Sequence, residues 1–251
     1  MHLTDIALLS LSGFFAGMIN AIAGGGTFLT FGALTLVGLP PISANATSSI
    51  TQFPGYVTST LAYWSDLKRM WRSALLMGVV SAIGAGVGAL ILLALSNPSF
   101  RAMVPWLLLA ATALFAAGPW LRPKGKAVTT TPEKATPLAL VLQFLTSIYG
   151  GFFGAGMGVM MLATLGLTQS GDYHRLNALK NLFSIIIAAV AVVVFVSGGV
   201  VAWPEAVVMI PAVALGGYAG VWTARRVPQL AVRLVVISIG LLLAIYYFAQ
   251  G

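Results

Sequence analysis

Amide and hydroxyl side chains recur at helical spacing in two places along an otherwise apolar chain. The first set, at positions i, i+3, i+4 and i+7, is Asn45, Ser48, Ser49 and Gln52. In the second half, Asn177 and Asn181 repeat the i, i+4 spacing, and Lys180 stands between them. Residues at these spacings share one face of a helix. Such hydrogen-bond donors can hold a small anion, and packing of small polar residues between helices is the alternative structural interpretation.

Glycines are grouped in both halves, ahead of these polar residues. The first group is Gly24, Gly25 and Gly26, and the second is Gly150, Gly151, Gly154, Gly156 and Gly158. A glycine costs about 1 kcal/mol inside a helix, so these groups predict broken helices. A helix beginning after Gly26 would present free amides from Thr27 to Leu29 at its positive end, which attracts anions. Asn20 can hydrogen-bond the exposed backbone before the break, and close helix packing at the glycines is the structural alternative.

The composition is that of a membrane protein. The chain has 251 residues, of which 59% are hydrophobic and 7% charged, against about 25% charged in a typical soluble domain, and the mean hydropathy is +0.98. The net charge of +8 lies in short clusters between apolar runs, which is typical of membrane loops and disfavours nucleic-acid binding. Cysteine is absent and only two histidines occur, so we expect no metal site, no cofactor and no enzymatic activity.

The elements that must position these residues are apolar helices. A spanning helix needs about 20 apolar residues, and six segments predict single spans, roughly 44–64, 73–95, 101–120, 177–197, 204–223 and 230–249. Two further segments, 6–38 and 138–167, contain the glycine groups, and each is too long for one span and too short for two. Broken backbone at membrane depth is tolerated where it is buried or lines a cavity.

The two halves form an internal repeat. Aligning Gly26 with Gly158 aligns Asn45-Ala46 with Asn177-Ala178 without a gap. We therefore predict a first repeat over residues 1–120, a cytoplasmic linker over 121–137 and a second repeat over 138–251. Repeats with broken helices are typical of secondary transporters.

The basic residues favour one topology over another. If both broken segments are re-entrant hairpins, twelve of the thirteen basic residues fall on one side and only Arg101 lies opposite. The predicted fold is thus an all-α integral membrane protein with two inverted repeats, each a glycine-broken hairpin plus three transmembrane helices, with both termini away from the cytoplasm. Eight full spans remain the alternative, and they would place seven basic residues on one side of the membrane and six on the other.

Lys180 has two interpretations within this fold. It lies a few residues into an apolar segment that continues to Val196, and an ammonium group there is costly unless it snorkels, pairs or faces a cavity. It either reaches the interface about one turn away or attracts a substrate anion. Since the predicted spans hold no carboxylate apart from Glu205, at the very start of 204–223, coupling to a proton through Lys180 and simple uniport are both open.

The motifs resemble those of the sulfite exporter TauE/SafE family. The first half carries Gly13-Phe14-Phe15-Ala16-Gly17, the Gly24–Gly26 group and Ala44-Asn45-Ala46-Thr47-Ser48-Ser49. The second half carries the run from Gly150 to Gly158 and then Asn177-Ala178-Leu179-Lys180-Asn181. Met157 interrupts the second glycine group, where some members keep consecutive glycines. The resemblance covers nearly the whole chain.

The resemblance implies a multi-pass permease for sulfite, sulfonates or related small organic anions, which we expect in the cell inner membrane. An anion channel is the alternative, although broken inverted repeats suit alternating access better. The expected partners are a small anion and the lipid bilayer, and the oligomeric state is open, a homodimer included.

Overall fold

The chain folds as a bundle of helices. The computed structural model describes residues 1–62, 67, 71–121, 136–169, 173–223 and 228–250, and these contain ten α-helices and no strand. The helices are α1 (Leu3–Ala23), α2 (Thr27–Leu36), α3 (Pro41–Ala62), α5 (Trp71–Leu93), α6 (Asn97–Leu121), α7 (Pro137–Phe152), α8 (Met157–Thr168), α9 (Tyr173–Ser197), α10 (Trp203–Thr223) and α11 (Gln229–Gln250). The all-α prediction is therefore confirmed.

Four of the described helices are long and apolar enough to cross a membrane. These candidate spans are Leu3–Ile22, Ala74–Leu93, Asn97–Ala117 and Arg175–Ser197. Three of them match predicted single spans, and the fourth is α1, the first arm of the first broken segment. With 10, 16 and 12 residues, α2, α7 and α8 are shorter than the roughly 20 residues of a span.

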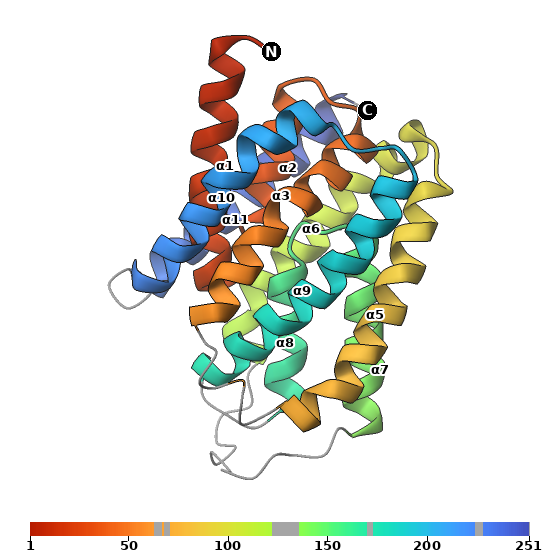
Figure 1. The fold of residues 1–251 in the computed structure, drawn as a ribbon, viewed down its shortest axis with the longest axis vertical. Coiled ribbons are helices and arrows are strands. Elements are labelled where there is room, and N and C mark those ends of the chain that lie inside the picture. Colours follow the sequence, from red (N-terminus) through yellow and green to blue (C-terminus); the bar gives the residue numbers. More distant parts are fainter. Residues whose placement is uncertain (63–66, 68–70, 122–135, 170–172, 224–227, 251) are drawn as a thin grey trace.

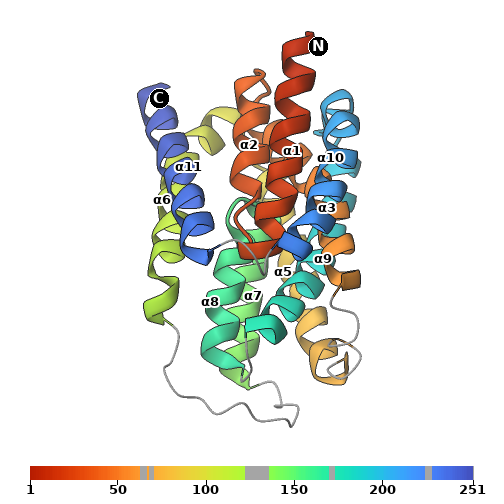
Figure 2. The same ribbon diagram turned by 90° about the vertical axis from the view of Figure 1, so that its left-hand side faces the viewer.

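The two broken segments form helical hairpins that enter the bundle from opposite ends. α1 runs inward from the end that holds both termini, and α2 returns toward that end (Figures 1 and 2). α7 starts at the other end, and α8 returns to it (Figure 2). The two bends lie at mid-height of the bundle, where α1 and α8 are in contact.

The breaks differ in detail from the sequence prediction. The first falls at the predicted glycines, since α1 ends before Gly24, which has a left-handed φ of 82°. The second falls in the later part of its predicted group, at Gly154 and Gly156, because α7 continues through Gly150 and Gly151 to Phe152 and α8 starts at Met157. Gly151 lies inside the helix and serves packing, because its backbone lies against that of Ala85 on α5, where a side chain would collide.

Each hairpin packs chiefly against a helix of the other half. α1 lies along α10, and α7 lies along α5, while α3 and α9 are in contact with each other. Glycines make both close contacts: Gly88 on α5 and Gly220 on α10, which correspond in the alignment of the halves, meet backbone atoms of α7 and α1. The shared packing pattern supports the inverted-repeat prediction. The boundaries 1–120, 121–137 and 138–251 stay predictions, and most of the linker lies outside the described residues.

The topology can be tested with single cysteines because the chain has none of its own. α6, whose first turn contains Ser99, starts at the end that holds both termini, and α7, which Thr136 precedes, starts at the opposite end (Figure 1). We expect a membrane-impermeant maleimide to label Ser99→Cys in intact cells and Thr136→Cys only after permeabilisation. Labelling of both residues in intact cells would contradict the predicted orientation.

Candidate functional site

The two breaks meet each other at the centre of the molecule. A Cβ on Gly24 would lie 2.7 Å from the carbonyl carbon of Gly158, so the two backbones touch. Beside them, the Gly156 amide donates to the Thr27 hydroxyl at 3.0 Å. The predicted glycines of the two halves are thus brought together, and only glycines fit so close an approach. Gly25 faces elsewhere, against the Val236 side chain of α11.

Lys180 is completely buried beside the first break. Its exposed fraction is 0%, and its Nζ donates to the Asn20 carbonyl at 2.9 Å. The snorkelling interpretation is therefore wrong. The amino group instead turns inward to the C-terminal end of α1, whose last carbonyls carry partial negative charge.

Asparagines cap the two broken helices crosswise between the halves. Asn177 Nδ2 on α9 donates to the Ala21 carbonyl in the last turn of α1, at 3.1 Å. The corresponding Asn45 Nδ2 on α3 donates to the carbonyl of Phe152, the last residue of α7, at 3.0 Å. We call this pair of contacts the crossed caps. They satisfy carbonyls that a broken helix leaves without a partner, so both asparagines have a structural role in addition to any contact with a ligand.

The rest of the first polar face contacts α2. The Ser48 and Thr30 hydroxyls share a hydrogen bond of 2.6 Å, and Gln52 Nε2 donates to Thr30 at 3.4 Å. Ser49 donates to the Asn45 carbonyl one turn earlier at 3.0 Å. The prediction of free backbone amides from Thr27 to Leu29 is corrected in part. In the tight first turn of α2, the Phe28 amide donates to the Gly25 carbonyl and the Leu29 amide to the Gly26 carbonyl.

The second polar face is less well satisfied. Both side-chain polar atoms of Asn181 are buried without a hydrogen-bond partner among the described residues, and the same holds for the Ser184 hydroxyl. Both residues have an exposed fraction of 0%. Buried polar groups left without partners are costly and uncommon, so these atoms are suited to contact a ligand.

Sequence reasoning missed three polar residues of this region. Ser184 completes the i, i+3, i+4, i+7 pattern that starts at Asn177, so the repeat alignment with Gln52 contained its signal. Thr30 lies on the short helix α2 and had no such signal. Tyr56, which is 2% exposed, interacts with the Asn20 side chain from α3.

A small cavity lies beside the two breaks. Its volume is about 10 Å³, and Thr27, Ser49, Tyr56, Gly154 and Met157 are among its lining residues. A volume of about 10–15 Å³ holds one water molecule, which is less than a sulfite ion needs.

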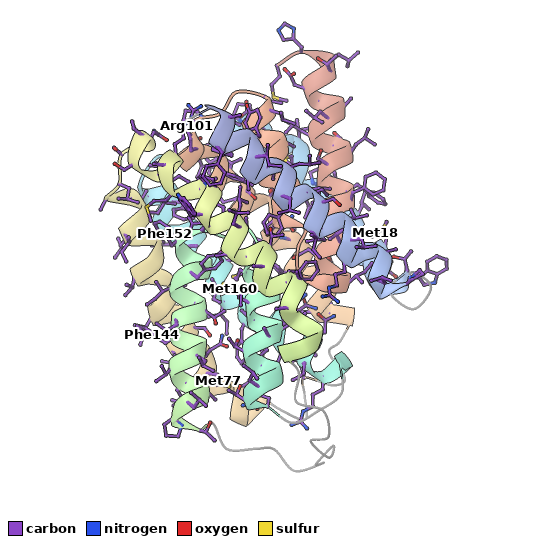
Figure 3. The ribbon with its side chains drawn as sticks, turned by 180° about the vertical axis from the view of Figure 1, so that it is seen from behind. Met18, Met77, Arg101, Phe144, Phe152 and Met160 are labelled. Carbon is purple, nitrogen blue, oxygen red and sulfur yellow. The ribbon has the colours of Figure 1, made fainter. Side chains whose placement is uncertain are left out.

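Aromatic rings fill the space between the second break and the end that holds both termini. Phe153, directly after α7, lies 5.4 Å from Phe31, and Phe31 stacks on Tyr247 at 5.8 Å. Phe100 lies 5.7 Å from Phe152. Figure 3 shows Phe152 near the inner end of α7, with Arg101 beyond it at the end that holds the termini. These rings separate the site from that end.

The fold and the site define a multi-pass membrane protein with two broken hairpins around a buried polar centre. The chain belongs to the sulfite exporter TauE/SafE family, whose model matches residues 9–247.

Among similar proteins, a probable membrane transporter protein ORF9 of Sinorhizobium sp is 31% identical over 173 residues, which are 69% of this chain and 64% of that protein. A probable membrane transporter protein of Haemophilus influenzae is 28% identical over 86% of this chain and 83% of its own length. The probable membrane transporter protein YfcA of Escherichia coli K12 is 27% identical over 82% of this chain and 75% of its own length. The protein is therefore a membrane transporter.

Proposed function

We propose that the protein is a secondary transporter that moves sulfite, organosulfonates or related small organic anions across the cell inner membrane. The anion binds where the two hairpins meet, beside Lys180 and the polar face of α9. The observation that carries this proposal is a fully buried lysine amino group whose hydrogen-bond acceptor is a neutral carbonyl.

The charge balance around Lys180 favours an anionic ligand. The described residues include two carboxylates, Asp5 and Glu205, and both lie in the first turns of their helices, at the end of the bundle that holds the termini. An unpaired lysine at the centre of a membrane helix costs about 2.5–3.5 kcal/mol. A bound anion would offset this cost, because it supplies the missing negative charge next to the ammonium group.

The hairpins add positive potential, and α9 adds hydrogen-bond donors. α2 and α8 both begin at the central breaks, so their positive N-terminal ends point toward the same region. The buried Asn181 amide and Ser184 hydroxyl supply donors on the α9 face that carries Lys180. This donor set suits the several oxygen atoms of a sulfite or sulfonate group.

The small volume of the cavity beside the breaks favours a carrier over a channel. A channel needs a continuous pore, whereas the site here has room for about one water molecule. A carrier passes through a closed state when it alternates between the two sides of the membrane.

The test is transport by the purified protein in proteoliposomes. Sulfite, sulfate, thiosulfate, sulfoacetate, taurine and simple carboxylates are compared as substrates. We expect saturable uptake of a sulfur oxyanion that is accelerated by the same anion on the opposite side. An ohmic current without saturation would instead identify a channel, and flux of none of these anions would refute the proposal.

A further inference from the structure

Lys180 is the one acidic or basic side chain among the described residues that is fully buried. Its Nζ lies 2.9 Å from the Asn20 carbonyl. An ammonium group and a neutral amine can both donate this hydrogen bond. The contact therefore persists whether or not the nitrogen carries the extra proton.

The elements around Lys180 offer few other groups that could hold a charge. On α1 the acidic residue is Asp5, in the first turn, while Asn20 lies in the last turn. The described side chains of α5 and α8 include no acid or base. α3 contributes the Tyr56 hydroxyl and α7 the Tyr149 hydroxyl, which donates to the Ala155 carbonyl. On α9 itself, Arg175 lies more than one turn closer to the end of the helix.

We propose that Lys180 also carries a proton through the transport cycle, one for each anion and in the same direction. The amine of the empty site takes a proton from the water on the side where the anion enters, and the ammonium then pairs with the anion. When the anion leaves on the other side, the ammonium releases the proton to that water and returns as an amine. This inference rests on the proposed function, because it requires the anion to bind beside Lys180.

The physical reason is the cost of carrying charge through the interior. An ammonium group alone in an empty and closed site has no counter-charge among the described residues, whereas an amine and an ammonium–anion pair are both neutral overall. Both the empty and the loaded site then change sides without moving net charge. Transport of a monovalent anion by this route is electroneutral.

The test uses wild-type proteoliposomes that contain a pH-sensitive dye, with ethanesulfonate as the probe. Ethanesulfonate is ionised at every accessible pH, so any proton that moves with it is carried by the protein. We expect an inward ethanesulfonate gradient to acidify the lumen by one proton per anion, at a rate that a potassium–valinomycin potential does not change. Net uptake without acidification would overturn the proposal.

Lys180→Arg provides the matched variant, because arginine keeps its charge and does not release its proton. The variant should retain exchange of labelled for unlabelled ethanesulfonate, because the empty site does not change sides during exchange. Its net uptake should fall at least tenfold. Net uptake with acidification at the wild-type rate would contradict the inference. If the variant lacks exchange as well, the wild-type acidification decides whether a proton moves with the anion. If the wild type itself lacks exchange, the proposed function fails for sulfonates.

Discussion

Gly24→Ala is expected to abolish transport. A Cβ at this position would lie 2.7 Å and 2.9 Å from the carbonyl carbon and Cα of Gly158. Because these are backbone atoms of the opposite hairpin, they can give way only if the two breaks separate. The measurement is uptake in proteoliposomes at matched protein levels, together with thermal stability, and we expect at least a hundredfold loss of uptake.

Gly38→Ala is the matched control for this variant. Gly38 also has a positive φ, 90°, but a Cβ there meets nothing within 4 Å. Both variants place an L-residue in the left-handed region, at a cost of about 1–2 kcal/mol. Gly38→Ala should therefore lower stability slightly and leave transport close to that of the wild type. Equal losses in the two variants would show that backbone strain, and not the contact between the hairpins, causes the defect.

The glycine contacts show what the sequence could and could not predict. The run Gly24–Gly26 predicts a break because consecutive glycines destabilise a helix. The run itself does not distinguish its three glycines, whereas in the structure Gly25 faces Val236 and Gly24 makes the contact with Gly158. The second group also contains its break, which falls at Gly154 and Gly156, while Gly150 and Gly151 serve helix packing. Composition and spacing do not encode which glycine meets which neighbour, because that depends on how the two halves dock.

The same limit applies to Lys180 and the asparagines. Their shared face follows from helical periodicity, and the repeat alignment relates it to Asn45 and Ser48. The direction of the lysine side chain does not follow, because snorkelling and burial are both compatible with a position near the start of α9. The carbonyls that receive Lys180 and Asn177 belong to α1, more than 150 residues earlier in the chain, and only the folded structure brings them together.

Lys180→Ala should weaken substrate binding by about tenfold to a hundredfold. A hydrogen bond to a charged group contributes about 1.5–3 kcal/mol, which corresponds to that range of affinity. Lys180→Arg should recover part of the loss, since it keeps the charge but changes the donor geometry. The measurement is the dissociation constant of the transported anion for the three proteins, with thermal stability recorded for each.

Arg233→Ala is the control for the loss of a cation that contacts a backbone carbonyl. Arg233 on α11 donates to the Ala116 carbonyl of α6, and neither of these helices belongs to a broken hairpin. Its removal should lower stability and leave affinity unchanged. If Lys180→Ala also left affinity unchanged, the anion would have to bind at the polar faces Asn45–Gln52 and Asn177–Ser184, with the helix ends as the source of positive potential.

The crossed caps impose an order on biosynthesis. The carbonyl of Ala21 receives its donor from Asn177, 156 residues later, and that of Phe152 is capped by Asn45, 107 residues earlier. Chains enter the membrane from the N-terminus, so the first hairpin waits for α9 with its terminal carbonyls uncapped, whereas the second finds its donor already made. Each uncapped carbonyl in hydrocarbon costs several kcal/mol. We therefore expect the first hairpin to reach its final depth only after α9 has been inserted, and the first half expressed alone to be degraded faster than the full chain.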